Sequence, residues 1–176
     1  MEILLHICCG VCLIYPFKVL KEKGFKIKGF FYNPNIHPFS EYKKRKETLE
    51  ELNKELNLEI FYPEYRPQDF FREINFSEAK EKRCPLCWRL RFKNTAEFAK
   101  KNNFKYFSTT LLVSPYQNQE RLKEIGNSIA KDLGIEFYYD DFRGGFKEAY
   151  TFAKNKDLYC QRYCGCIYSE IERWKR

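Results

Sequence analysis

The segment EILLHICCGVC, residues 2–12, decides the fold, because an apolar run leads directly into a turn with three cysteines. Glu2–Ile7 is short, apolar and typical of a buried strand. Pro16–Lys23 is predicted to be helical, with Pro16 in its first turn and Gly24 as its C-terminal stop. A strand that runs through a turn into a helix is the first half of a βαβ unit.

The same alternation of strands and helices continues along the chain. Further strands are expected at 26–32, 59–62, 106–113 and 135–139, and helices from Ser40, from Pro85 to about Lys101, and at 119–133. Alternation with near-continuous apolar strands predicts helices on both faces of a parallel sheet. The sequence therefore predicts an α/β, Rossmann-like (HUP-type) three-layer sandwich, a mostly parallel five-stranded sheet in one domain over residues 1–176.

The composition indicates the compartment of the protein and the charge of its partner. Thirty-two Lys and Arg against 24 Asp and Glu give a net charge of +8, and 18% of residues are aromatic. This balance suits a polyanionic partner, although Lys-rich and Glu-rich composition is also typical of heat-adapted proteins. Neither a signal peptide pattern nor an apolar run of about 20 residues is present, so we expect a cytoplasmic protein without membrane association.

Eight cysteines are unusual in a chain long enough to fold without disulfides. In a reducing compartment, clustered thiols more often bind metal or do redox chemistry. They fall into three groups: Cys8, Cys9 and Cys12; Cys84 and Cys87; and Cys160, Cys164 and Cys166.

Most of the chemistry-bearing residues follow predicted strands, where a parallel sheet binds its ligands. These residues are Cys8, Cys9, Cys12, Asn33, His37, Tyr62, Tyr65, Ser114, Asp140 and Asp141. Asp141 is either a cap of the following Gly-Gly turn or a metal ligand or acid. His6 is expected to be a core imidazole, and the run Lys43–Lys46 a solvated helix face.

The spacing leaves two kinds of metal site open. Structural zinc needs four ligands, commonly from two Cys-x-x-Cys pairs, and would leave four cysteines unexplained. An iron–sulfur cluster uses four thiolates and leaves about three for a second metal. Because adjacent residues of an extended chain point to opposite sides, Cys8 and Cys9 are expected to serve different metals.

Several ordered blocks carry a resemblance to a known family. They are HICCGVC (6–12), FFYNPNIHPFSEYKKR (30–45), RCPLCWRLRF (83–92), YFSTTLLVSPYQN (106–118), and DDFRGGF followed by YCQRYCGCIYSE. The chain resembles the cobalamin-independent epoxyqueuosine reductases of the QueH family over nearly its whole length. The resemblance implies a [4Fe-4S] cluster, a nearby iron, and reductive removal of the epoxide oxygen of epoxyqueuosine in tRNA to give queuosine.

The resemblance assigns seven thiols to metal and leaves Cys160 aside, because that position is expected to be Arg. We expect the cluster on Cys9, Cys84, Cys87 and Cys166, and the iron on Cys8, Cys12, Cys164 and Asp141, with the Cys-rich segment 157–176 completing the site. Asp141 or Tyr163 is the expected proton donor.

The expected partners are the tRNA anticodon loop and an external electron-donor protein, because no flavin or nicotinamide fingerprint is visible. Two alternative functions remain. The first is an iron–sulfur tRNA-thiolation enzyme, but the sequence lacks the phosphate-binding loop of that class. The second is a zinc-bearing nucleic-acid-binding module.

Overall fold

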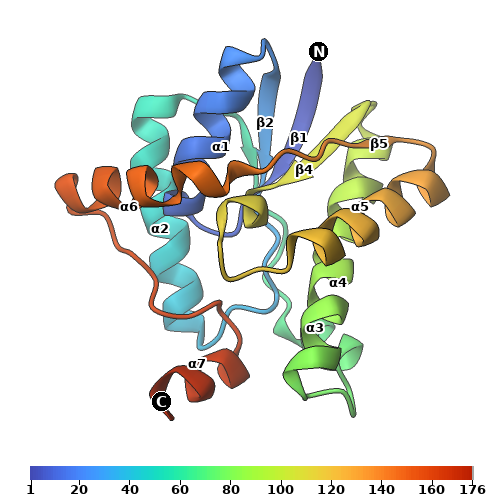
Figure 1. Cartoon of the computed structure of the whole chain (residues 1–176), viewed down its shortest axis with the longest axis vertical. Helices are drawn as coiled ribbons and strands as arrows, with labels where there is room; N and C mark the ends of the chain where they lie inside the picture. Colours follow the sequence, from blue (N-terminus) through green and yellow to red (C-terminus); the bar gives the residue numbers. More distant parts are fainter. Residues whose placement is uncertain (176) are drawn as a thin grey trace.

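The computed structural model describes residues 1–175 and is built around a five-stranded sheet of order β3-β2-β1-β4-β5 (Figure 1). Each neighbouring pair of strands is parallel. β1 is central, and its Ile3, Leu4 and Leu5 have no exposed surface, which is why this strand is apolar on both faces. The predicted α/β, Rossmann-like fold is confirmed.

Strands and helices alternate along the chain as the sequence predicts. The strands are β1 (Glu2–His6), β2 (Lys26–Phe30), β3 (Ile60–Phe61), β4 (Tyr106–Thr109) and β5 (Glu136–Phe137). The helices are α1 (Gly10–Glu22), α2 (Phe39–Leu56), α3 (Pro67–Glu73), α4 (Lys80–Lys101), α5 (Gln119–Leu133), α6 (Phe146–Asn155) and α7 (Ile167–Trp174), with two 3₁₀ turns, η1 (Thr110–Val113) and η2 (Phe142–Gly145).

The helices form two layers. Helices α1, α2 and α6 pack together on one side of the sheet, and α4 packs with α5 and α3 on the other (Figure 1). The strand order reverses at β1, so the end of β1 is the topological switch point where such sheets bind ligands. The three cysteines of the opening segment follow that end directly.

Several predicted boundaries are wrong, and proline is the main reason. Helix α1 begins at Gly10, and α4 begins at Lys80, so Pro16 and Pro85 lie inside helices instead of starting them. Helix α2 begins at Phe39 after Pro38, not at Ser40. β1 ends at His6 and β4 at Thr109, earlier than expected, because the chain turns into α1 and η1.

None of the helices within residues 1–175 combines the length and the apolar character that a bilayer-spanning helix requires.

Candidate metal centre

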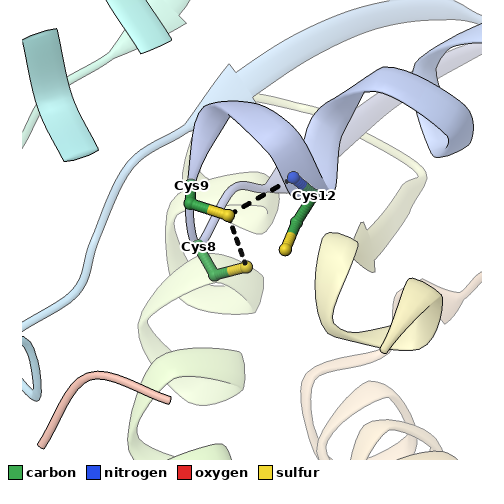
Figure 2. Close-up of side chains that lie close together, drawn as sticks. All are labelled: Cys8, Cys9 and Cys12. Carbon is green, nitrogen blue, oxygen red and sulfur yellow. Dashed lines mark hydrogen bonds between the residues drawn. The ribbon is translucent and has the colours of Figure 1, made fainter. Parts of the chain in front are cut away.

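Three thiols meet at the turn between β1 and α1. The Sγ atoms of Cys8, Cys9 and Cys12, here called the thiol trio, all lie within 4.8 Å of one another, and all three residues are buried (Figure 2). Cys9 is the N-cap of α1, where its sulfur accepts the backbone N–H of Cys12 at 3.3 Å. The expectation that Cys8 and Cys9 point apart is wrong, because the strand has already ended at His6.

The three thiols of the trio differ in pKa because each has different neighbours. Contacts with the thiols of Cys12 and Cys9 and a hydrogen bond from the Thr110 hydroxyl at 3.2 Å hold the pKa of Cys8 well below its usual range. Burial raises the pKa of Cys9, and donation to Cys8 raises that of Cys12. Cys8 is therefore the thiol of the trio that loses its proton most readily, and a metal that binds all three sulfurs displaces the protons of Cys9 and Cys12.

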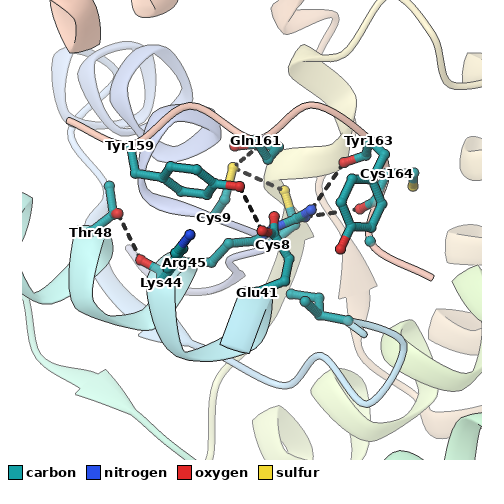
Figure 3. Close-up of polar contacts among 12 residues, drawn as sticks. Cys8, Cys9, Glu41, Lys44, Arg45, Thr48, Tyr159, Gln161, Tyr163 and Cys164 are labelled. Carbon is teal, nitrogen blue, oxygen red and sulfur yellow. Dashed lines mark hydrogen bonds and ion pairs between the residues drawn. The ribbon is translucent and has the colours of Figure 1, made fainter. Parts of the chain in front are cut away.

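The C-terminal segment covers the trio through one amide. Gln161 Nε2 donates to Cys9 Sγ at 2.9 Å (Figure 3) and to Cys12 Sγ at 3.4 Å. Its Oε1 is buried without a partner in the described residues. Amide N–H groups on thiolates stabilise the thiolate form, so Gln161 supports a negatively charged sulfur centre.

Four further thiols are here called the thiol quartet: Cys84, Cys87, Cys164 and Cys166; within residues 1–175, the thiol sulfurs that all lie within 4.8 Å of one another are those of the trio. Cys87 and Cys166 are buried in one small apolar cluster with Phe70 and Ile74. Burial, together with the negative charges of Cys164 and Cys166, raises the pKa of Cys84 to about 11 and of Cys87 to about 12. The α4 start and the C-terminal segment are thus brought together around thiols.

The buried guanidinium of Arg91 interacts electrostatically with thiols of both the trio and the quartet. Arg91 is 1% exposed, and the charges of Cys87, Cys164 and Cys8 all act on it. Its Nε donates to Cys87 O at 3.3 Å, and its Nη2 is buried without a partner in the described part of the chain. Arg91 therefore provides positive charge to both groups of thiols.

A second buried arginine holds the C-terminal segment against the centre. Arg45 Nε binds Glu41 Oε1 at 2.7 Å, and its Nη1 and Nη2 donate to the carbonyls of Cys164 and Tyr163 at 2.9 and 3.0 Å (Figure 3). Glu41 Oε2 accepts the hydroxyl of Tyr159 at 2.6 Å. The expectation of a solvated face is wrong for Arg45, which is 2% exposed.

The other predicted site residues have partners of their own. Asp141 caps η2 and pairs with Arg143, which lowers the pKa of Asp141 and keeps its carboxyl ionised. An ionised carboxylate suits a metal ligand better than a proton donor. The Tyr163 hydroxyl donates to His37 O, and burial raises its pKa. Cys160 Sγ contacts Leu158 O at 3.6 Å. The ligand and acid roles of Asp141 and Tyr163 stay predictions.

Comparison with known proteins identifies the family. A family model described as "Epoxyqueuosine reductase QueH" matches residues 3–172.

The chain belongs to the QueH family.

A QueH from Dehalococcoides mccartyi is 38% identical to this chain, over 98% of it and 94% of the relative. A QueH from Thermotoga maritima is 34% identical, over 97% of this chain and 91% of the relative. A solved structure described as a predicted subunit of a tRNA methyltransferase from Methanocaldococcus jannaschii aligns with a TM-score of 0.56 at 14% identity, over 88% of this chain and 74% of that chain. At that identity, the likeness shows the fold alone.

Sequence reasoning on this QueH chain missed the polar residues that organise the thiols. Arg45 was hidden in a run of basic residues, and Gln161 has no chemical signal of its own. Arg83 and Arg91 are 3% and 1% exposed, and the charges of nearby thiols act on both. Their position next to the cysteine pair of α4 was the available signal, because buried thiolates need nearby positive charge.

Proposed function

We propose that the chain removes the epoxide oxygen of epoxyqueuosine in tRNA, and that its seven clustered thiols hold a [4Fe-4S] cluster and a mononuclear iron. The observation that carries the proposal is the compact thiol trio at the switch point of a QueH-family chain, with Cys87 and Cys166 of the quartet buried together in one cluster. Soft thiolates in groups of three and four, with buried arginines beside them, fit a cluster and a second metal better than one closed zinc site.

The reaction consumes two electrons and two protons and yields an alkene and water. When bound, the cluster supplies electrons singly and the iron supplies Lewis acidity toward oxygen. The chain's own residues exclude water by burying the trio, hold thiolate charge with Arg91 and Arg45, and fix the C-terminal segment through Gln161. Asp141 and Tyr163 are the proposed ligand and proton-donor candidates.

The grouping of the sulfurs favours one change in the division of ligands. The division expected from the sequence puts Cys9 on the cluster and Cys164 on the iron, whereas the sulfur of Cys9 lies close to those of Cys8 and Cys12, and the charge of Cys164 acts on Cys84 and Cys87. Four coupled thiols match a four-thiolate cluster, and three thiols leave a fourth position on iron for an oxygen ligand. We therefore propose the quartet for the cluster and the trio for the iron.

Anaerobic purification with iron and acid-labile sulfide analysis tests the metal content. Incubation with tRNA containing epoxyqueuosine and a strong reductant, followed by nucleoside mass spectrometry, tests the reaction. We expect iron, sulfide and queuosine. Colourless protein with zinc and no sulfide, or iron-loaded protein that forms no queuosine, would overturn the proposal.

Two serine variants with a matched control test the division. Cys164→Ser is expected to lose acid-labile sulfide, whereas Cys9→Ser keeps sulfide and loses one iron. Cys160→Ser is the control, because Cys160 lies in neither group and should keep all metal. Loss of sulfide in Cys9→Ser with retention in Cys164→Ser would restore the division expected from the sequence.

The proposed partners are tRNA and an electron-donor protein, and the proposed location is the cytoplasm. The net charge of +8 supports a polyanionic partner. Single-stranded bases of the anticodon loop can leave their stack to enter a protein site. Affinity for tRNA should fall steeply with salt, because each phosphate contact releases counterions.

A further inference from the structure

The loop between β2 and α2 contains an unusual set of buried polar atoms. Asn33 Oδ1, Asn35 Oδ1 and both ring nitrogens of His37 lack a hydrogen-bond partner in the described residues. The three residues are 2%, 1% and 7% exposed. An unpaired buried polar atom costs about 1–3 kcal/mol, and whole domains contain few of them. Four such atoms within residues 33–37 indicate that this loop is shaped for a bound group.

The loop forms a wall of the metal centre. Asn33 Nδ2 donates at 2.8 Å to the carbonyl oxygen of Ile7, which directly precedes Cys8. His37 N donates at 2.8 Å to Gly165 O, between two quartet cysteines. Gly165 has φ 145°, and a Cβ there would lie 3.1 Å from Asn35 Nδ2. The loop is thus fixed between the segments that carry the trio and the quartet.

The chemistry of the unpartnered atoms selects the kind of ligand. Amide oxygens accept N–H and O–H donors, and an imidazole buried in apolar surroundings is neutral and offers one acceptor and one donor. None of the three side chains is cationic, so the loop does not match phosphate. Within residues 1–175, the compact group of metal-ligating atoms consists of the thiol trio and does not include His37.

We propose that Asn33, Asn35 and His37 bind the modified base of the substrate through its uncharged N–H and O–H groups and hold it beside the thiols. This inference rests on the proposed function. Aromatic rings line the same loop: Phe71 stacks on His37 with ring centroids 4.7 Å apart, and Phe71 and Phe39 are 43% and 60% exposed. Exposed rings at the edge of a base site match the stacking that unstacked bases require.

Two apolar replacements separate substrate binding from structural roles. His37→Phe keeps the ring and the backbone hydrogen bonds but removes both nitrogens, and Asn35→Leu keeps the volume but removes the amide. If the unpaired atoms serve the substrate, both variants keep or gain thermal stability, because buried unpaired polar atoms disappear. Both should lose substrate recognition.

The measurement is the ratio of affinities of anaerobic holoprotein for tRNA with epoxyqueuosine and for the same tRNA with unmodified guanosine. We expect the wild type to prefer the modified tRNA and each variant to lose roughly tenfold of that preference, the value of one hydrogen bond of about 1.4 kcal/mol. Affinity for the unmodified tRNA should stay unchanged, since phosphate contacts carry it. The KM for modified tRNA should rise in parallel.

Two control variants define what the result means. Asn127→Ala changes an exposed asparagine of α5 and should keep the wild-type preference. His6→Phe should lower stability, because both nitrogens of His6 have partners, Thr109 Oγ1 at 3.0 Å and Tyr32 O at 3.1 Å. A wild type that forms queuosine, with His37→Phe and Asn35→Leu equal to it in preference, overturns this inference alone. A wild type that forms no queuosine overturns the proposed function.

Discussion

The buried pair of Arg45 and Glu41 should be the most sensitive polar contact of the fold. Their side chains are 2% and 8% exposed, and Nε lies 2.7 Å from Oε1. Arg45→Met leaves the Glu41 carboxylate buried without its cation, a loss that typically costs about 3–5 kcal/mol. At roughly 2–4 °C per kcal/mol for a domain of this size, the midpoint of thermal unfolding should fall by about 6–20 °C.

The assay is thermal and urea unfolding of metal-free protein, followed by iron content after anaerobic reconstitution. Lys43→Met is the matched control, because Lys43 pairs with Glu47 at the same i,i+4 spacing of α2 but both side chains are exposed. It should cost less than about 0.5 kcal/mol. The double variant Glu41→Gln with Arg45→Met should recover part of the loss. An Arg45→Met cost no larger than that of Lys43→Met would refute the reasoning.

Three further predictions concern packing, the sulfurs and pH. Gly145→Ala should destabilise by about 1–3 kcal/mol, since its Cβ would lie 1.9 Å from the Tyr15 ring, whereas Gly144→Ala meets nothing within 4 Å and should be neutral in urea unfolding. Gln161→Leu removes two N–H···S contacts and should make the reduction potential of the bound metal more negative, measured by anaerobic titration. Metal affinity of the thiol trio should rise with pH, because thiols with raised pKa values are protonated at neutral pH and must release protons. Chelator competition should show about a tenfold gain per pH unit for each proton, and a flat profile would contradict the protonated state.

The sequence was sufficient for the architecture because hydrophobic runs and their spacing are local signals. β1 (EILLH) is a short apolar run, β2 (KIKGF) alternates lysines with less polar residues, and the helices that follow them are long enough to be recognised. Helices α3, α6 and α7 were missed. α3 and α7 have seven and eight residues, which is shorter than the window over which helical periodicity is read, although α7 repeats apolar residues at Ile167, Ile171 and Trp174.

The candidate site was predicted in its cysteines and missed in its polar support. Thiols at close spacing are visible in any sequence, whereas the contacts of Gln161 with Cys9 and of Arg45 with Cys164 join residues more than a hundred positions apart. A glutamine or a lysine-flanked arginine looks solvated until the fold buries it. The turn after His6 likewise decides that Cys8 and Cys9 converge, which the pleat of an extended strand does not predict.

Arg91 connects the fold to the proposed metal centre through charge. A fully buried guanidinium needs a counter-charge, because an isolated cation in a low-dielectric interior is costly. Its hydrogen bond goes to the neutral carbonyl of Cys87, and the negative groups that act on it are the thiols of Cys87, Cys164 and Cys8. Burial raises the pKa of Cys87, so without metal that thiol is protonated and supplies the guanidinium with no negative charge. Metal binding keeps such thiols deprotonated, and the charge that completes the metal centre is therefore also the charge that balances the core of the protein.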